Sequence, residues 1–340
     1  MSTKRKNLKA AQAILFFALG VFLIFYFWNT LTKKEQHDII QNFYSTHFIG
    51  IVLPLLAGIL SHIFRALRWN MLMETVGIQT RLGESFWAVM VGYLFNLAIP
   101  RLGELMRCVF LSRKKKQPLD SILGTMISER MFDLLWYVLL FIISLFIFMG
   151  TVNEYVTQYG TMFVNSLTTK WQHWLAGLML LLLLVWLTMY ILRKRKPTSW
   201  EKIRFFFKNM LNGMLAIFKL KRWYLFLLYT IFIWIMYWLM IYLAYLSLRT
   251  TAGLSPESAF VVLIFATLGI MVIQGGIGIY PIIVAEILQL YNLPRVDGYA
   301  LGWITWTVQT LLVIVLGLVG LLYFSLNKKY EKQGKDIAKN

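Results

Sequence analysis

The stretch "NLAIPRLGELMR", from Asn96 to Arg107, interrupts a long apolar run. It holds a proline, which breaks a helix, and three charged side chains, which a lipid-facing helix avoids. Backbone without helical hydrogen bonds is tolerated at membrane depth only where protein or water surrounds it. The stretch therefore predicts the tip of a helical hairpin that is buried inside a membrane protein.

The composition of the whole chain agrees with a membrane protein. Its 340 residues are 59% hydrophobic and 14% charged, and the mean hydropathy is +0.65. A soluble domain carries roughly a quarter charged residues. Several apolar runs approach or exceed the ~20 residues that cross a bilayer as a helix. These features predict an all-α, polytopic integral membrane protein.

The net charge of +19 does not indicate nucleic acid as a partner. Membrane proteins collect lysine and arginine on their cytoplasmic side, and no Gly-rich or RNP-like pattern accompanies the basic clusters. The four histidines have no metal-ligand spacing, no Walker motif is present, and the single cysteine, Cys108, excludes an internal disulfide. We therefore expect no cofactor, no metal and no nucleic acid.

Membrane segments follow one another along almost the whole chain. Two of them, 84–113 and 257–291, are broken at Pro100 and at "GGIGIYP" (Gly275–Pro281). Their second arms are too short to cross a core of ~30 Å at 1.5 Å per residue. We expect both to be re-entrant hairpins. The six expected full spans are 10–28, 48–73, 119–149, 173–192, 223–248 and 299–326.

The distribution of charge favours re-entrant hairpins. With the basic N-terminus inside, this arrangement leaves five of the 34 lysines and arginines outside, and most of the others inside. Two full but tilted crossings per broken segment would give the same sidedness. Both termini are then cytoplasmic, with a basic tail at 327–340, and the inner membrane is the expected location.

The order of segments repeats within this single transmembrane domain. Residues 1–150 and residues 173–326 each contain two spans, a hairpin and a further span. With three full crossings in each half, the second half is inverted relative to the first. Inverted repeats whose broken helices meet near the midplane are typical of transporters. We therefore expect the two hairpin tips to meet.

The first hairpin tip carries candidate ligands for an anion. In each hairpin the second arm begins at the tip, so a helix N-terminus with free N–H groups points into the protein. Arg101 and Arg107 each lie three residues from Glu104, so the three side chains are expected to form one charged row. Two interpretations stay open: an anion site for a lipid phosphate, or a set of ion pairs that holds the hairpin.

Other charges in membrane segments are also candidates. "SERMFD" (128–133) adds Glu129, Arg130 and Asp133, which are either functional or an ordinary ion-pair cluster near the cytoplasmic interface. Beside Trp69, Arg65 and Arg68 are expected to meet lipid headgroups, and Glu286 is expected to pair with an arginine of a tip. The candidate substrate-binding residues are Arg101, Glu104, Arg107, Glu129, Arg130, Asp133, Gln274, Gly275, Gly276, Gly278 and Tyr280, with Asn96, Arg65, Arg68 and Glu286 as secondary candidates.

Three motifs resemble those of one known family, the lysylphosphatidylglycerol synthase transmembrane region. "RLGELMR" (101–107) resembles its R-x-G-E-x-x-R, "ERMFD" (129–133) its E-R-x-x-D, and "GGIG" (275–278) its G-G-x-G. The resemblance covers about residues 10–326 and implies flippase-like translocation of lipid. This chain has Pro281 where many members carry a glutamate, and Gln274 where they carry a proline.

The resemblance and the charges together give one preferred function and two alternatives. We expect a non-enzymatic transporter for an anionic phospholipid or lipid-linked phosphate. No soluble aminoacyl transferase domain is recognisable, so a separate synthase or transferase would be a partner. The alternatives are a transferase acting on polyprenyl-phosphate lipids, with Glu129 or Asp133 as base, and an accessory membrane subunit without chemistry.

Overall fold

The computed structural model describes residues 32–44, 46–99, 101–151 and 220–337, with residues 29, 205, 208 and 218 singly. Every element in this part of the chain is a helix, which confirms the predicted all-α class. Within these ranges, four helices are long and apolar enough to cross a membrane, as expected for a polytopic membrane protein. The predicted spans 10–28 and 173–192 lie outside the described residues.

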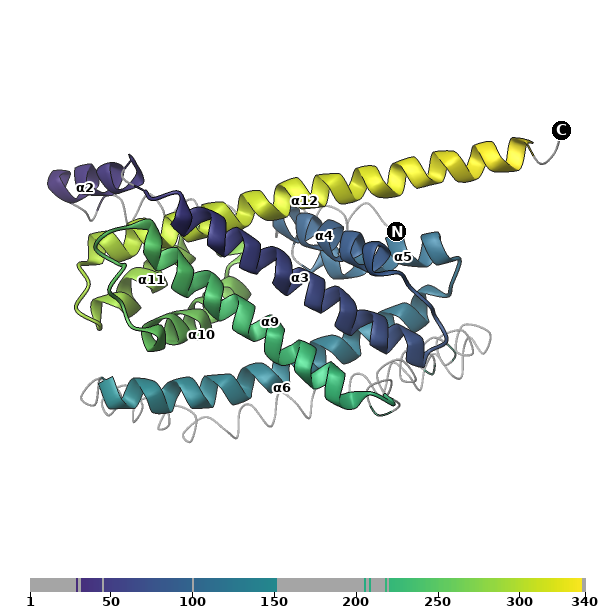
Figure 1. Ribbon diagram of the computed structural model, residues 1–340, viewed down its shortest axis with the longest axis horizontal. Helices are drawn as coiled ribbons and strands as arrows, with labels where there is room; N and C mark the ends of the chain where they lie inside the picture. Colours follow the sequence, from purple (N-terminus) through teal and green to yellow (C-terminus); the bar gives the residue numbers. More distant parts are fainter. Residues whose placement is uncertain are drawn as a thin grey trace, which may run out of the picture.

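The four membrane-length helices follow the long axis of the molecule (Figure 1). The short helix α2 (Lys33–Tyr44) lies beside the beginning of the last of them (Figure 1). Three of the four spans predicted in this range match a helix to within two residues at both ends, whereas the helix that contains 299–326 begins at Arg295 and continues to Ile337. The four helices are α3 (Ile49–Thr75), α6 (Leu119–Thr151), α9 (Trp223–Ala244, continued by η2, Tyr245–Ser247) and α12 (Arg295–Ile337).

The first broken segment forms α4 (Leu82–Ala98) and α5 (Leu102–Lys115). The chain leaves the helix at Ile99, which is extended, and Arg101 adopts a left-handed conformation with φ 60°. The side chain of Asn96 closes the turn, since its Oδ1 accepts a hydrogen bond from the Gly103 N–H at 2.8 Å. Asn96 thus satisfies one of the free N–H groups at the start of α5. Pro100 itself lies outside the described residues.

Two glycines allow α4 and α5 to cross closely. A Cβ atom added at Gly103 would lie 1.7 Å from the carbonyl oxygen of Gly92, a distance that no side chain tolerates. The same close approach brings a Cβ atom at Gly92 within 2.9 Å of the Gly103 carbonyl oxygen. The glycine in "RLGE" is therefore required by packing between the two arms of the hairpin.

The second broken segment forms α10 (Pro256–Val272), the short turn η3 (Gln274–Gly276) and α11 (Ile279–Gln289). Gly275, Gly276 and Gly278 all have positive φ, between 68° and 76°, which other residues adopt at a cost. The indole Nε1 of Trp306 on α12 donates a hydrogen bond to the Gly275 carbonyl oxygen at 2.7 Å. The glycine-rich sequence thus forms the turn, and α12 holds it.

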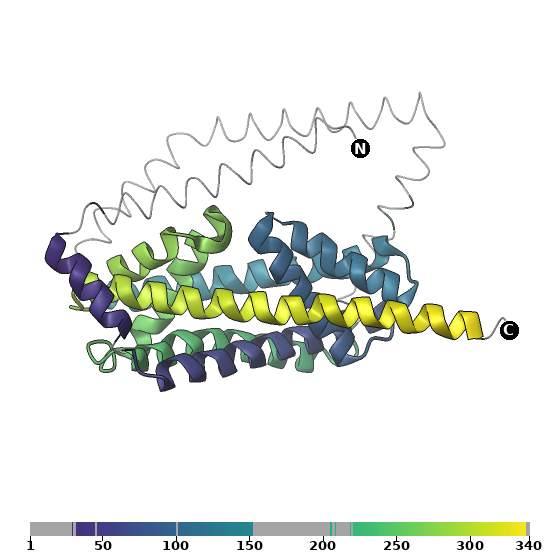
Figure 2. The ribbon, with the colours of Figure 1, turned by 90° about the horizontal axis from the view of Figure 1, so that it is seen from above.

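The two hairpins approach each other from opposite ends of the long axis (Figure 2). Their tips meet, since a Cβ atom at Gly275 would lie 3.9 Å from Cδ2 of Leu97. The inverted-repeat prediction includes a meeting of the two tips, and this part of it concerns residues that the structure describes. The predicted symmetry of the halves also depends on segments 10–28 and 173–192, so it stays a prediction.

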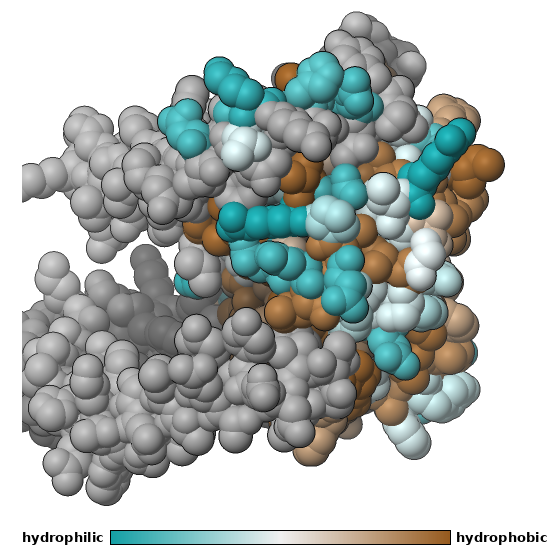
Figure 3. Space-filling view, turned by 90° about the vertical axis from the view of Figure 1, so that its left-hand side faces the viewer, coloured by the Kyte–Doolittle hydropathy of each residue, from teal (hydrophilic) through white to brown (hydrophobic). Residues whose placement is uncertain are grey.

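Basic residues distinguish the two ends of the helix bundle. Residues 113–116 and 221–222, which are all basic, lie at the end where α5 finishes and α9 begins, whereas Lys33, Lys34, Arg249 and Arg295 lie at the other end. Polar side chains gather at this second end, where they are expected to leave the membrane (Figure 3). By the positive-inside rule we propose that the first end is cytoplasmic.

Cysteine labelling in intact cells tests this orientation. A Gln117→Cys variant should react with a membrane-impermeant maleimide only after the cytoplasm is opened, because Gln117 is exposed between α5 and α6. A Gly253→Cys variant should react from outside, since no atom lies within 4 Å of a Cβ atom at that position. Cys108 is fully buried and contributes little background. Labelling of both variants from the same side would contradict the proposal.

Candidate functional site

A cluster of buried charges joins α3, α5 and α6. It contains four arginines and two carboxylates, and we refer to it as the charged cluster. Its members are Arg65 and Arg68 on α3, Arg107 on α5, and Glu129, Arg130 and Asp133 on α6.

Glu129 is the centre of the charged cluster, and its side chain has no exposed surface. Its Oε1 accepts hydrogen bonds from Arg65 Nη1 at 3.0 Å, Arg68 Nη2 at 3.1 Å and Arg130 Nη2 at 3.2 Å. Its Oε2 accepts one from Arg107 Nη2 at 2.9 Å. Four guanidinium groups therefore share one buried carboxylate.

Asp133, one helical turn further along α6, completes the pairing. Its carboxylate lies 2.6 Å from Arg68, 3.0 Å from Arg65 and 3.2 Å from Arg130. Arg130 also lies 3.7 Å from Glu104 of α5, where both side chains are about one-third exposed. With Glu104 included, four arginines and three carboxylates leave one net positive charge.

Polar and aromatic groups around the charged cluster connect it to a fourth helix. Arg65 Nη2 donates to the hydroxyl of Tyr237 at 3.2 Å, and Arg68 Nη1 donates to Thr230 Oγ1 at 3.1 Å, both on α9. The guanidinium of Arg107 lies 4.6 Å from the ring centroid of Trp69. The cluster thus joins α3, α5, α6 and α9 deep inside the protein, where an unpaired charge would be very costly.

The structure corrects two expectations about the arginines. Arg65 and Arg68 do not meet lipid headgroups, because they are 5% and 0% exposed and pair with the carboxylates of α6. The predicted row of ion pairs within residues 101–107 does not form either. Arg107 turns towards Glu129, and Glu104 lies nearest to Arg130.

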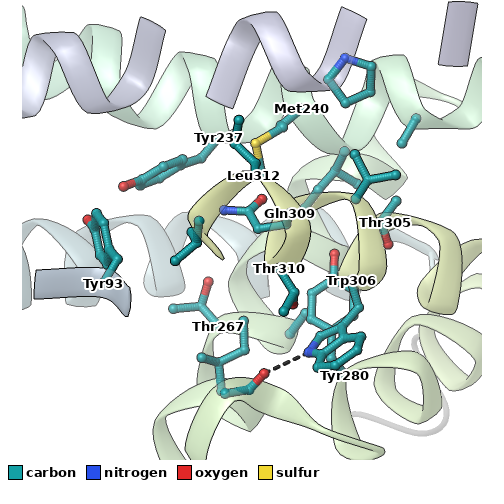
Figure 4. Close-up of a pocket in the computed structure, with 18 of the residues that line it drawn as sticks. Tyr93, Tyr237, Met240, Thr267, Tyr280, Thr305, Trp306, Gln309, Thr310 and Leu312 are labelled. Atoms are coloured by element: carbon teal, nitrogen blue, oxygen red, sulfur yellow. Dashed lines mark hydrogen bonds between the residues drawn. The ribbon is translucent and has the colours of Figure 1, made fainter. Parts of the chain in front are cut away.

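A cavity of about 870 Å³ lies between the two hairpins, α3, α9 and α12. Figure 4 shows side chains of these elements that face it, with Tyr93 from α4 and Tyr237 from α9 on one side and Gln309 from α12 near the middle. Its volume is within the range of small-molecule sites. Much of its wall is apolar, and the charged residues that line it within the described ranges, Arg101 and Glu104, both come from the first hairpin.

Among the residues that the structure describes, Arg101 is the cation that lines this cavity. It precedes α5 directly, its side chain is exposed, and it makes no ion pair with any residue in the described ranges. Its left-handed backbone is uncommon for a residue with a Cβ atom and costs roughly 1 kcal/mol or more. An uncommon conformation beside a cavity is consistent with a functional role for the side chain.

The other candidates of the hairpin tips occupy different positions around the cavity. Asn96, Glu104, Gly275 and Tyr280 line it. Gly276 and Gly278 shape the second tip, and a Cβ atom at Gly276 would lie 2.9 Å from the Ile270 side chain. The backbone of Gln274 belongs to η3, while its side chain lies outside the described part of the chain.

A second, small pocket, which we call the extension, shares lining residues with the cavity and with the charged cluster. It measures about 30 Å³, enough for one water molecule. Tyr93, Asn96 and Glu104 line both the cavity and the extension, whereas Arg107 and Arg130 line the extension alone. The charged cluster is thus adjacent to the cavity, but its central carboxylate is not part of the wall.

Glu286 is not close to a tip arginine, contrary to expectation. It is exposed, and its Oε1 accepts a hydrogen bond from Arg295 Nε at 2.8 Å. It lies eight residues beyond Gly278, and a helical rise of 1.5 Å per residue carries it ~12 Å away from the tip. This pair belongs to the surface between α11 and α12.

Several neutral residues of the cavity wall were not predicted from the sequence. They are Tyr93, Tyr237, Thr267, Thr305, Trp306 and Gln309. Gln309 could have been recognised from the sequence, since it is an amide in the middle of the apolar run 299–326. The other residues could not, because threonine and aromatic residues are common in membrane helices. Among the described residues, no group of three or more His, Cys, Asp or Glu could hold a metal ion.

Comparison with known proteins gives one match. The family model described as "Lysylphosphatidylglycerol synthase TM region" matches residues 13–317, which include both hairpins and the charged cluster. The family suggests a membrane function related to lipids. No curated protein and no solved structure matches the chain.

Proposed function

We propose that this chain, which belongs to the lysylphosphatidylglycerol synthase transmembrane-region family, binds an anionic phospholipid or lipid-linked phosphate between its hairpins and moves it across the membrane. The observation that carries the proposal is Arg101, an arginine without an ion pair in the described structure, at the wall of a large cavity. We further propose the plasma membrane as its location, with both termini in the cytoplasm.

The charges around the cavity favour an anionic ligand. Arg101 supplies a guanidinium, which binds phosphate through two parallel hydrogen bonds. It stands at the start of α5, where the helix dipole also favours negative charge. The first two N–H groups of α5, those of Leu102 and Gly103, already donate to Ile99 and Asn96. The charged cluster behind Arg101, taken together with Glu104, has one net positive charge, so it adds to the attraction.

The apolar wall of the cavity suits the rest of a lipid. Apolar side chains from α9, α10 and α12 line it, among them Met240, Leu263, Ile270 and Leu312. In the proposed mechanism the phosphate enters between the hairpins while the acyl chains stay in the bilayer. The headgroup then avoids the hydrocarbon core, which is the main barrier to its crossing.

The charged cluster has a positioning role in this proposal. Arg107 and Glu129 connect α5 to α6, and through Arg65 and Arg68 also to α3. The first hairpin is thereby fixed in the protein, with Arg101 at its tip facing the cavity. We propose that Glu129 and Asp133 hold the arginines and do not touch the lipid.

A transport assay with purified protein in liposomes tests the proposed function. Phosphatidylglycerol with a fluorescent acyl chain is placed in both leaflets, and dithionite destroys the fluorescence of the outer leaflet. Protein-containing vesicles should lose nearly all fluorescence, and protein-free vesicles about half, because only transport exposes the inner lipid. If labelled lipid is chemically converted, the chain is a transferase. Loss of only half the fluorescence, with no conversion, would fit an accessory subunit and reject transport.

A further inference from the structure

The cavity has a second polar region, and it differs from the region around Arg101. Thr267 of α10 and Thr305, Gln309 and Thr310 of α12 line it. Figure 4 shows the amide of Gln309 projecting from α12 among the surrounding side chains, with Thr267 opposite. These groups carry no charge, so they suit a neutral part of a ligand.

Two of these residues offer hydrogen-bond acceptors to the cavity. Thr267 Oγ1 donates its proton to the Leu263 carbonyl oxygen at 2.6 Å, and Thr305 Oγ1 donates to the Leu301 carbonyl oxygen at 2.9 Å. A hydroxyl that has donated its proton keeps lone pairs that accept. The amide of Gln309 can both accept and donate. This region therefore favours a ligand group that donates hydrogen bonds.

A donor group on a lipid headgroup is either an ammonium or a hydroxyl, and the charges of the cavity decide between them. Among the described residues that line it, Arg101 is the cation and Glu104 the carboxylate. Glu104 lies 3.7 Å from Arg130, so its charge is already opposed by an arginine. An ammonium would be repelled by the net positive surroundings, whereas a hydroxyl carries no charge.

The charges of the residues that line the cavity also disfavour a headgroup with a second anionic group. The parts of α9, α10, α11 and α12 that line the cavity include no lysine or arginine. A carboxylate or second phosphate beside Thr305 and Gln309 would lose its water without gaining a cation. The lining thus divides into a cationic region for one phosphate and a neutral, acceptor-rich region.

We propose that the cavity selects a phosphate ester whose headgroup bears uncharged hydroxyl groups, as glycerol and sugars do, over headgroups with an ammonium or a carboxylate. The phosphate lies at Arg101, and the hydroxyls donate to Thr267, Thr305 and Gln309. This inference rests on the proposed function and adds the class of headgroup to it.

Transport of four labelled lipids through the full-length protein tests the inference. Phosphatidylglycerol and phosphatidylinositol carry hydroxyls, phosphatidylethanolamine carries an ammonium, and phosphatidylserine carries both an ammonium and a carboxylate. The first two should move on the order of tenfold faster than the last two, since loss of one well-made hydrogen bond changes an equilibrium by about this factor. Equal rates for the first two would show that any polyol fits, and a slower inositol lipid would restrict the site to glycerol.

A Gln309→Leu variant tests the neutral region itself. It should slow phosphatidylglycerol roughly tenfold and leave phosphatidylethanolamine unchanged, so that the selectivity disappears. Gln289→Leu is the matched control, because Gln289 is exposed on α11 and does not line the cavity, and it should transport as the wild type does. If Gln309→Leu fails to fold, Thr267→Val removes a neighbouring acceptor and should act in the same direction.

The outcomes separate this inference from the proposed function. If wild-type protein moves all four lipids at equal rates, transport stands and headgroup selection is wrong. Faster movement of the ammonium lipid would also overturn the selection. If no lipid moves above the protein-free rate, both the transport proposal and the selection that depends on it are rejected.

Discussion

An Arg101→Gly variant should lose lipid transport by about 10- to 100-fold while its fold is at least as stable as that of the wild type. Transport falls because a charge-assisted hydrogen bond to phosphate, worth about 1.5–3 kcal/mol, is removed. Stability holds because Arg101 has φ 60°, which glycine adopts without the clash of a Cβ atom. Thermal unfolding in detergent and the liposome assay measure the two effects separately.

Lys116→Gly is the matched control for this variant. Lys116 also has a positive φ, 53°, and it follows α5 as Arg101 precedes it. The substitution also removes one positive charge and relieves the strain of a left-handed backbone conformation, but Lys116 does not line the cavity. It should gain about the same stability and keep full transport. Full transport by folded Arg101→Gly, or equal loss in both variants, would contradict a phosphate site at Arg101.

The second large effect concerns stability. A Glu129→Gln variant should unfold far more easily, by about 3–5 kcal/mol, because removing one partner leaves buried charges uncompensated. Glu129 is the carboxylate that all four arginines of the charged cluster share, and it has no exposed surface. The amide keeps the size of the side chain, so the loss reports charge and not packing. Unfolding by heat or denaturant in detergent measures it.

Glu104→Gln serves as the control for Glu129→Gln. The chemical change is identical, but Glu104 is about one-third exposed and lies 3.7 Å from a single arginine. Partly exposed pairs contribute about 1 kcal/mol or less. Similar stability losses in the two variants would show that the charged cluster does not hold α5 to α3 and α6. A stable Glu129→Gln protein without transport would instead assign Glu129 to the transport pathway.

The positions of the hairpins could be predicted because local sequence determines them. Pro100 and the glycines at 275, 276 and 278 interrupt apolar runs, and the described chain leaves the helix at Ile99 and at Ile273. The charged candidates Arg107, Glu129 and Asp133 were also recognisable, since charges in membrane segments are rare. The sequence alone thus indicated where the helices break and which charged residues lie within membrane segments.

The pairing of the charges could not be predicted in the same way. Arg65 and Glu129 are 64 residues apart, and their contact depends on how α3 packs against α6. The place of Arg65 and Arg68 beside Trp69 indicated a headgroup contact, but both side chains are buried between helices. The neutral residues of the cavity wall could not be predicted for a related reason. Thr267 and Thr305 have the same residue type as many threonines in membrane helices, and only the packing of the hairpins places them at a cavity.

The most direct measurement is an electron cryomicroscopy structure of the protein in nanodiscs that contain phosphatidylglycerol. Our account predicts density for a lipid phosphate inside the cavity, within hydrogen-bonding distance of the Arg101 guanidinium and the start of α5, with acyl chains leading out to the bilayer. A cavity without lipid, with phosphates only at the outer rim of the protein and Arg101 paired to a carboxylate, would contradict it.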